Sequence, residues 1–301
     1  MKLYEFEAMQ TLLGPFRVPV PEFLVLPVDD PQSEEQIHRF FQKHPECVLK
    51  SQVLVGKRGK AGGVLTADRA DSALAAYRQL CRKAIWGELP RAIMICERLD
   101  IEKELYVSIT YSPSHRSPAL ALSLLGGVEI ESQSPEDLHV FEIPPESELL
   151  PFQVREWLLR IGFDIPELLR PLSEVIARLY RTFWENEARL LEINPLAIVR
   201  DRQTGKRKLV AADAVVILDD DASYPPTKRF SPRGSMGRPP TERELAAAEI
   251  DAGDHRGKAG SYIELDGDIA MMTFGGGGST VIAETAFQLG LKPANLTDIG
   301  G

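Results

Sequence analysis

The chain has 301 residues, of which 44% are hydrophobic and 26% charged, and its formal net charge is −9 with a pI of about 5.2. This length allows two domains, each with its own core, and the composition is typical of a globular protein. The acidic balance excludes general nucleic-acid binding, and no apolar run is long enough to span a membrane. With no signal peptide at the N-terminus, the sequence predicts a cytoplasmic protein without nucleic-acid or membrane partners.

The first half of the chain alternates predicted helices and strands. Apolar residues at helical spacing predict a helix over residues 3–13, which ends at Gly14-Pro15, and a polar helix over residues 33–43. A third helix, with alanine and leucine on one face, is predicted over Asp68–Lys83. Short apolar runs predict strands at Pro19–Leu26, Val48–Lys50, Gly63–Thr66, Ala92–Glu97, Glu104–Thr110 and Ala119–Leu125.

The second half begins with a proline-rich connector and a helical region from about 152 to 188. Two strands follow, Leu190–Val199 and Lys208–Leu218, and they are expected to form a hairpin. Residues 219–241 contain three aspartates and five prolines with little apolar periodicity, which is typical of a linker. One apolar stripe in the helical region predicts core packing rather than a cofactor site: Leu172, Val175, Ile176, Leu179 and Phe183.

After the linker, the pattern predicts the start of a new α/β unit. A strand at Ile269–Phe274, a glycine-rich run, a helix at Thr280–Leu289 and a short strand at Asn295–Ile299 follow one another. The chain ends at Gly300-Gly301, where a further helix would be expected. Because about 45 residues give too small a core, we expect this second domain to be truncated.

A basic, glycine-rich loop follows the predicted strand that ends at Lys50. Residues 56–63 contain four glycines, two lysines and Arg58. Glycines let a backbone approach a ligand closely, and cations beside them suit a polyanion. The loop is not a P-loop, because Ala61 stands where a magnesium-binding Ser or Thr would be needed. The loop alone fits either a phosphate site or a solvated basic turn.

The predicted hairpin supplies a candidate metal site. If its turn is centred directly after Gln203, the numbers of opposed residues sum to 407. Asn194 then faces Asp213, and Glu192 projects from the same face, because side chains alternate with a period of two. Hard oxygen ligands at that separation suit Mg²⁺. The alternative is a hairpin whose polar face is merely in contact with water.

Two carboxylates and a second glycine-rich run complete the candidate residues. Glu97 and Glu104 lie at strand ends, where they either accept hydrogen bonds from an adenine or a ribose or are simply solvated. The run Gly275–Ser279 lies between a strand and a helix, which places backbone amides and a helix N-terminus around an anion. A flexible linker is the alternative for this run. The five histidines and the cysteines Cys47, Cys81 and Cys96 form no catalytic or metal-binding pattern.

Together these motifs resemble the β subunit of succinyl-CoA synthetase and its relatives, the NDP-forming acyl-CoA synthetases that include ATP-citrate lyase. The resemblance runs along nearly the whole chain, and the motifs stand in the family's order. They are Leu3-Tyr4-Glu5-Phe6-Glu7-Ala8, Lys50 with Gly59–Val64, Lys103–Tyr106, Gly126–Glu131, Glu192–Leu196, Leu265–Ile269, and Pro293–Asn295 with Asp298–Gly301.

The resemblance implies an α/β protein with an ATP-grasp nucleotide-binding domain over residues 1–235. It also implies a linker over 219–245 and, over 246–301, the N-terminal part of a flavodoxin-like CoA-ligase domain. The implied nucleotide-binding residues are Lys50, Lys57, Arg58, Gly59, Glu97 and Glu104, the metal ligands are Asn194 and Asp213, and the residues for the acid substrate are Phe274, Gly275, Gly276, Gly277 and Ser279.

The implied activity is that of an ADP-forming acid–thiol ligase of the tricarboxylic acid cycle. It uses Mg²⁺, ATP or GTP, and CoA as co-substrate. The phosphoryl group would pass from ATP to a histidine on a partner α subunit and then to a small carboxylic acid, after which CoA displaces it. No catalytic residue is expected in this chain, which would therefore be inactive without its partner in a heterodimer or heterotetramer.

Several positions depart from the family pattern. Lys57 stands where the family often has a second glycine, Leu125 replaces a frequent glutamate, and Val215 replaces a common lysine. Phe274 occupies the position of an acid-binding asparagine in succinate-type members, and Gly275–Ser279 is similar to the loop of citrate-type members. Because both features resemble citrate-type members, we expect succinate only slightly ahead of citrate as the acid, with malate behind. The alternatives are a non-catalytic nucleotide-binding module and an ATP-grasp carboxylate–amine ligase.

Overall fold

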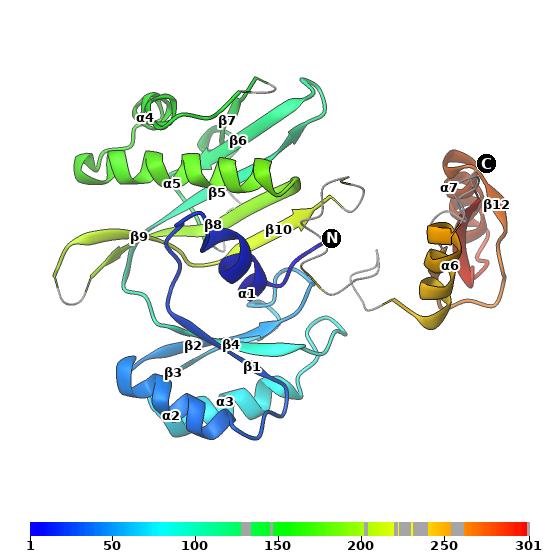
Figure 1. Cartoon of the computed structure of the whole chain (residues 1–301), viewed down its shortest axis with the longest axis horizontal. Coiled ribbons are helices and arrows are strands. Elements are labelled where there is room, and N and C mark those ends of the chain that lie inside the picture. The colour runs from blue at the N-terminus through cyan, green and yellow to red at the C-terminus, as the bar shows by residue number, and fades with distance from the viewer. Residues whose placement is uncertain are drawn as a thin grey trace. The chain divides into compact units, whose positions relative to one another are not determined.

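The computed structural model describes residues 1–127, 134–144, 147–201, 204–219, 222, 230, 240–253 and 262–299. The chain divides into a larger unit, Lys2–Pro226, and a smaller unit that comprises Met1 and Thr227–Gly301. Two sheets form the larger unit and one sheet the smaller (Figure 1). Within the described residues, no helix is both long and apolar enough to cross a membrane.

The first sheet of the larger unit has four antiparallel strands in the order β1-β4-β2-β3. Helices α2 and α3 cover its outer face (Figure 1). Apolar residues of α3 recur at helical spacing and are buried against β2 and β4, which explains why this segment folds as a helix. The elements are β1 (Phe23–Pro27), α2 (Ser33–Lys43), β2 (Cys47–Gln52), β3 (Val64–Ala67), α3 (Ala70–Cys81) and β4 (Ala92–Glu97).

The second sheet has the order β10-β8-β5-β6-β7, and β9 also pairs with β8. Helices α4 and α5 cover one face of it (Figure 1). All five residues of the predicted apolar stripe are at most 4% exposed on α5, which confirms core packing. The elements are β5 (Ile101–Ser112), β6 (Ser117–Ser123), the 3₁₀ turn η3 (Pro135–Asp137), β7 (His139–Glu142), α4 (Pro151–Arg160), α5 (Pro166–Glu185), β8 (Ala188–Arg200), β9 (Arg207–Ala211) and β10 (Ala214–Leu218).

The N-terminal helix lies between the two sheets (Figure 1). It consists of α1 (Glu5–Glu7) and a π-helical segment, η1 (Ala8–Leu13), and it ends at Gly14 as predicted. The Leu3 amide donates to the Val216 carbonyl at 3.0 Å, which fixes the start of the helix beside β10. The residues of α1 are thereby held at the junction of the two sheets.

The predicted hairpin forms, but its second strand is interrupted. In each pair of β8 with β9, and of β8 with β10 up to Ile217, the numbers of the two opposed residues sum to 407. The predicted register is therefore confirmed. Asn194 and Asp213 lie at the interruption between β9 and β10. There the Ala212 amide donates to the Pro195 carbonyl at 3.0 Å. The second strand is therefore split at Asp213, opposite Asn194 on the continuous strand β8.

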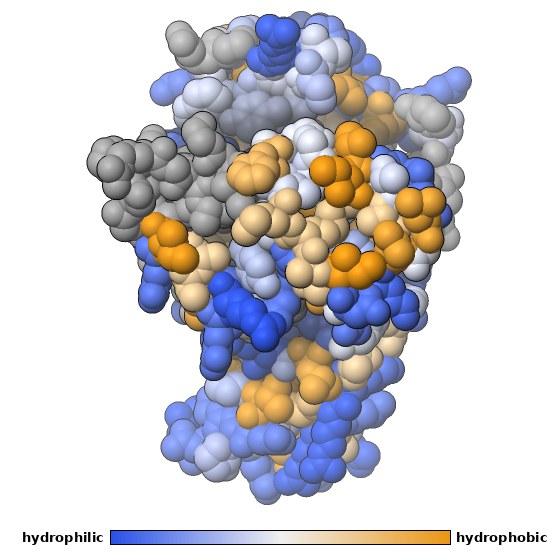
Figure 2. Space-filling view, turned by 90° about the vertical axis from the view of Figure 1, so that its right-hand side faces the viewer, coloured by the Kyte–Doolittle hydropathy of each residue, from blue (hydrophilic) through white to orange (hydrophobic). Residues whose placement is uncertain are grey.

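The smaller unit has a three-stranded sheet in the order β11-β13-β12, in which β12 and β13 are parallel. Figure 2 shows apolar side chains on the surface of this unit. Exposed apolar residues of its helix α7 include Val281, Ile282 and Phe287. The elements are α6 (Glu242–Gly253), β11 (Tyr262–Glu264), β12 (Thr273–Phe274), α7 (Gly276–Gln288) and β13 (Asn295–Ile299).

Some element boundaries were predicted wrongly. The strand predicted from Pro19 begins only at Phe23, after two prolines that cannot donate to a ladder. The last helix begins at Gly276 rather than Thr280, so glycines predicted as a loop form its first turn. Elements α6, β7 and β11 were not predicted. Residues 128–131 and 300–301, parts of two family motifs, lie outside the described residues, and the domain boundary at 235 remains a prediction.

Replacement of Leu172 by Ala should lower the free energy of unfolding by about 2–5 kcal/mol, because this side chain is fully buried on α5 and leaves a cavity. Leu159→Ala on α4 is the matched control: its side chain is 60% exposed, and the change should be within about 0.5 kcal/mol. Urea unfolding followed by tryptophan fluorescence measures both. Equal effects would contradict the assigned core.

Candidate functional site

A cavity of about 960 Å³ lies between the two sheets of the larger unit. Strands β2 and β4 supply one wall, and β5, β8 and β10 supply the other. The glycine-rich loop at 56–60 also borders it. All eight residues predicted to bind nucleotide or metal line this one cavity: Lys50, Lys57, Arg58, Gly59, Glu97, Glu104, Asn194 and Asp213.

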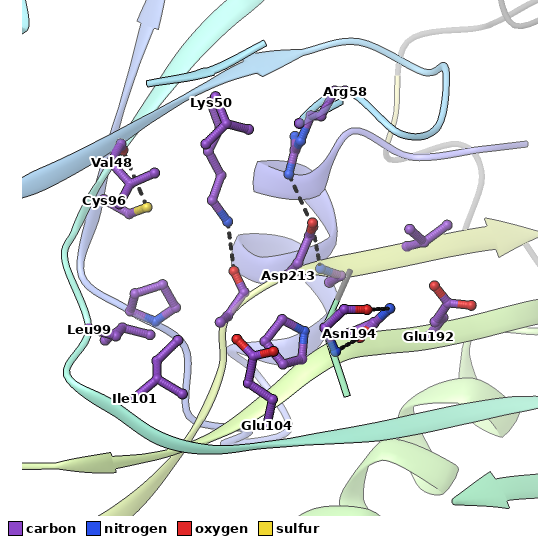
Figure 3. Close-up of a pocket in the computed structure, with 18 of the residues that line it drawn as sticks. Val48, Lys50, Arg58, Cys96, Leu99, Ile101, Glu104, Glu192, Asn194 and Asp213 are labelled. Atoms are coloured by element: carbon purple, nitrogen blue, oxygen red, sulfur yellow. Dashed lines mark hydrogen bonds and ion pairs between the residues drawn. The ribbon is translucent and has the colours of Figure 1, made fainter. Parts of the chain in front are cut away.

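The cavity has an apolar end and a charged end (Figure 3). Leu99 and Ile101 lie at the apolar end with Cys96, whose thiol donates to the Val48 carbonyl at 3.5 Å. Burial raises the pKa of Cys96 to about 11, so the thiol is neutral and serves as part of the apolar wall. A ligand with a flat, weakly polar part and an anionic part would match this division.

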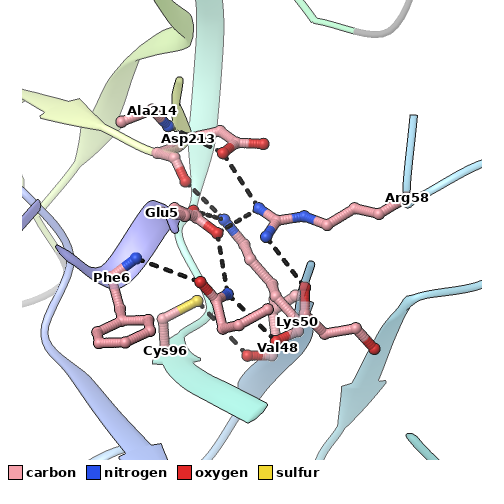
Figure 4. Close-up of polar contacts among 11 residues, drawn as sticks. Glu5, Phe6, Val48, Lys50, Arg58, Cys96, Asp213 and Ala214 are labelled. Atoms are coloured by element: carbon pink, nitrogen blue, oxygen red, sulfur yellow. Dashed lines mark hydrogen bonds and ion pairs between the residues drawn. The ribbon is translucent and has the colours of Figure 1, made fainter. Parts of the chain in front are cut away.

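Lys50 and Arg58 reach the charged end from the first sheet and share one carboxylate (Figure 4). The Lys50 Nζ donates to Glu5 Oε1 at 2.7 Å and to the Ala212 carbonyl at 2.7 Å. The Arg58 Nη2 donates to Glu5 Oε2 and, at 3.1 Å, to Asp213 Oδ1. Helix α1, strand β2 and the interrupted hairpin therefore meet in a single network of charges.

Glu5 is a buried anion whose charge is held by these two cations. Its side chain is 2% exposed. Burial acts to raise the pKa of Glu5, but the charges of Arg58 and Lys50 outweigh it and lower the pKa to about 2. Burial likewise acts to lower the pKa of Lys50, but Glu5 reverses this and raises the pKa above its ordinary value. Both groups are therefore charged at neutral pH.

Asn194 is fixed at the opposite wall by the backbone of Gly127. The Gly127 amide donates to Asn194 Oδ1 at 2.7 Å, and Asn194 Nδ2 donates to the Gly127 carbonyl at 3.2 Å. Nearby, the Tyr106 hydroxyl donates to Glu192 Oε2 at 3.0 Å. Both polar side chains of β8 that line the cavity are thus oriented by hydrogen bonds.

The donor set at this wall fits Mg²⁺. The Asp213 side chain is 38% exposed and lines the cavity, while its Oδ1 accepts from Arg58 and from the Ala214 amide. Enclosure and the charge of Glu5 raise the pKa of Asp213, although Arg58 opposes them. Across the described residues no group of three His, Cys, Asp or Glu side chains could hold a metal. One amide and one carboxylate suit Mg²⁺, which takes its other ligands from water and phosphate.

Glu97 and Glu104 line the cavity on β4 and β5. Glu97 Oε1 accepts a hydrogen bond from the Glu22 amide at 3.0 Å, which holds the carboxylate at the strand end. The Glu104 carboxylate packs against Gly127, where a Cβ would lie 1.9 Å from Glu104 Oε2. With a φ of +91°, Gly127 also adopts a backbone conformation that favours glycine. Gly127 therefore lies against Glu104 and is hydrogen-bonded to Asn194.

The glycine-rich loop returns to β3 through its own hydrogen bonds. The Gly62 amide donates to the Gly59 carbonyl at 3.0 Å, and the Gly63 amide donates to the Arg58 carbonyl at 2.8 Å. Lys57 has a φ of +57°, in the left-handed region. This conformation is strained for lysine and not for glycine, which the family often carries at this position. The backbone itself therefore does not explain the lysine.

The five residues predicted to bind the acid lie together in the smaller unit, at the start of α7. Phe274 is 72% exposed, and Gly275 precedes the helix with a φ of +76°. Ser279 is buried: its hydroxyl accepts from Thr273 at 2.6 Å and donates to the Gly275 carbonyl at 3.0 Å. Gly276 and Gly277 form the first helical turn, whose amides lack partners within the helix. Their role remains a prediction.

Glu5 was missed as a member of the site. The sequence shows Glu5 only as part of a family motif, with no role in the site assigned to it. The signal was present, because Glu5 lies on the buried face of the helix, at helical spacing from Ala8, Met9 and Leu12. A carboxylate on an apolar face requires a buried partner, and Lys50 at the end of a buried strand was a candidate.

Comparisons with known proteins agree on the fold. The chain matches the ATP-grasp domain over residues 2–198. It is 35% identical to the β subunit of the ADP-forming succinate–CoA ligase of Methanocaldococcus jannaschii. It is 33% identical to the β subunit of the GDP-forming succinate–CoA ligase of Thermus thermophilus. Both alignments cover all of this chain and 75% of the relative. The solved ATP citrate lyase of Methanothrix soehngenii superposes with a TM-score of 0.75 at 20% identity, over all of this chain and 72% of that chain. The predicted α/β fold is confirmed.

Replacement of Glu5 by Gln should lower the free energy of unfolding at neutral pH by about 3–5 kcal/mol, because two buried cations lose their shared carboxylate. The pKa of Glu5 is about 2 in the folded chain and 4.5 ordinarily. The stability that its charge provides is therefore present above pH 4.5 and is lost as the pH falls towards 2.

Urea unfolding at a series of pH values measures this difference between the two chains. It should be constant near neutrality and shrink in acid. Glu7→Gln, on the same helix, is the matched control, because Glu7 accepts from the Tyr4 amide instead of the two cations. A difference that persists unchanged down to pH of about 2 would show that Glu5 does not carry this charge.

Proposed function

The chain belongs to the ATP-grasp family that includes the β subunits of succinate–CoA ligases, and we propose that it is the nucleotide-binding subunit of an ADP-forming acid–CoA ligase. The reaction converts a carboxylic acid, CoA and ATP into acyl-CoA, ADP and phosphate. One observation carries the proposal: a single cavity brings Lys50 and Arg58 to face Asn194 and Asp213. The names of the relatives support the same activity.

The two ends of the cavity would bind different parts of the nucleotide. The base and ribose lie against the apolar end, where Glu97 and Glu104 accept hydrogen bonds. The triphosphate lies at the charged end, where Lys50 and Arg58 neutralise the charge that phosphoryl transfer spreads over the phosphate oxygens. Asn194 and Asp213 would hold Mg²⁺, which adds positive charge beside the phosphates when bound.

The acceptor of the phosphoryl group comes from outside this chain. No histidine is among the described residues that line the cavity. A histidine of a partner α subunit attacks the terminal phosphorus, and ADP leaves. The phosphoryl group then passes to the carboxylate of the acid, and the CoA thiol displaces phosphate to form the thioester. The partner requirement of the chain follows from this sequence of steps.

Succinate is the proposed acid, in line with the names of the relatives. The resemblance to citrate-type members favours citrate as the second candidate, because Phe274 stands at the position of an asparagine in succinate-type members. In the structure Phe274 is exposed and is followed by a glycine-rich helix start. Backbone amides at Gly276 and Gly277 would hold a carboxylate of either acid. The nucleotide is proposed to be ATP, with GTP as the alternative.

Replacement of Lys50 by Met should weaken Mg-ATP binding about 10- to 100-fold, because the phosphates lose one charged hydrogen-bond donor. Isothermal titration calorimetry of the folded chain measures the affinity. Lys43→Met is the matched control, since Lys43 lies on α2, pairs with Glu22 and does not line the cavity. Absence of Mg-ATP binding by the unchanged chain would overturn the proposed function.

The replacement of Lys57 by Gly isolates the charge that is specific to this chain. Glycine adopts the observed φ without strain, so the loop should keep its conformation. We expect Mg-ATP to bind about two- to fivefold more weakly, as for the loss of one partly solvated charge. Unchanged affinity in the same titration would show that the phosphates do not use Lys57.

The acid is identified by co-expression with an α-type subunit. ADP release that depends on CoA is measured with succinate, citrate and malate in parallel, and release is expected to be fastest with succinate. A faster rate with citrate would assign the chain to the citrate-type branch. Mg-ATP binding without CoA-dependent release on any acid would leave the non-catalytic module, and release with an amine instead of CoA would indicate a carboxylate–amine ligase.

A further inference from the structure

Glu5 lies behind the two cations that face the cavity. The side chains of Lys50 and Arg58 are 11% and 12% exposed, and both line the cavity. The Glu5 side chain is 2% exposed and is not among the lining residues. Figure 4 shows dashed contacts from its carboxylate to the ends of both cationic side chains. A ligand in the cavity therefore meets the cations first, on the side away from Glu5.

The position of Glu5 does not depend on the cations alone. Gln52, two residues after Lys50 on β2, donates from Nε2 to Glu5 Oε2 at 3.4 Å. The same amide accepts from the Phe6 backbone through Oε1 at 3.2 Å, which ties α1 to β2. Residues two apart on a strand share a face, so Gln52 and Lys50 both point to the helix. Glu5 is thus fixed before any ligand arrives.

The donors of the two cations are not exhausted by these contacts. An ammonium has three N–H groups, and Lys50 uses two of them, on Glu5 and on the Ala212 carbonyl. A guanidinium has five, and the contacts of Arg58 go to Glu5, Asp213 and Ser51. Both side chains therefore keep N–H groups that could donate to an anion in the cavity that they line.

Without the carboxylate, two adjacent buried cations would repel each other and would be drawn to different partners. Arg58 would keep Asp213, while Lys50 would keep only the Ala212 carbonyl. Glu5 removes this repulsion in the empty site. An anionic ligand then does not need to bring the cations together at the moment of binding.

We propose that Glu5 is a positioning residue for the triphosphate of the nucleotide: it holds Lys50 and Arg58 side by side from behind, so that the phosphates meet a preformed pair of cations. The inference rests on the proposed function. The opposite role, a carboxylate that competes with the phosphates for the same cations, is disfavoured because Glu5 lies outside the space that the ligand enters.

The test compares Glu5→Gln with the unchanged chain in its binding of Mg-ATP and of adenosine, by direct and by competition calorimetry. Mg-ATP should bind about tenfold more weakly or worse to the variant, because the two cations separate. Adenosine, which has no phosphates, should bind within about twofold of the unchanged chain. A general distortion of the cavity would weaken both ligands alike.

Three further variants sharpen the result. Glu5→Asp keeps the charge and should bind Mg-ATP more tightly than Glu5→Gln, and it serves as the main variant where the glutamine chain does not fold. Glu7→Gln, on the same helix, should leave both affinities unchanged, because Glu7 accepts from the Tyr4 amide and does not line the cavity. In a chain that already carries Lys50→Met, adding Glu5→Gln should weaken Mg-ATP binding less than it does alone.

Equal or tighter Mg-ATP binding by Glu5→Gln would overturn the inference and indicate a competing carboxylate or a structural residue. Equal losses for ATP and adenosine would also overturn it. These outcomes leave the proposed function intact, because the unchanged chain would still bind Mg-ATP. Failure of the unchanged chain to bind Mg-ATP would overturn both.

Discussion

The site depends on a single carboxylate buried between two cations. A charge removed from water is stable only when paired and hydrogen-bonded, so Glu5, Lys50 and Arg58 require one another. Glu5 comes from the N-terminal helix, whereas Lys50 and Arg58 come from a strand and the loop that follows it, 45 and 53 residues further along the chain. Arg58 extends the network to Asp213, between two strands of the second sheet. The packing of the two sheets around the N-terminal helix is therefore tied to the correct assembly of the charged end of the cavity.

Much of the site was predictable because the features that mark its residues can be recognised in short stretches of the sequence. A strand that ends in a lysine, a loop with four glycines and a hairpin with a countable register are all visible in the sequence, and the register of 407 survives the interruption at Asp213. These features, with the family resemblance, suffice to name eight residues that line one cavity. Each of these features is read from one continuous stretch of the sequence.

The parts that were missed depend on distant contacts. Glu5 is 45 residues from Lys50 and 53 from Arg58, and no local pattern states which buried cation a buried carboxylate will meet. The early start of α7 was missed for a different reason. Glycine is a weak helix former, so three glycines indicate a loop unless packing overrides that preference. In the structure they form the first turn before a buried Ser279.

The interruption between β9 and β10 leaves the carbonyl of Ala212 to accept from Lys50. Every residue type carries this oxygen, so the contact is independent of the side chain at position 212. The carbonyl contact itself therefore needs only the backbone of residue 212, whereas the contacts of Glu5 and Asp213 need their carboxylates. The position of the Lys50 ammonium is thus set partly by the path of the chain between two strands and not only by side chains.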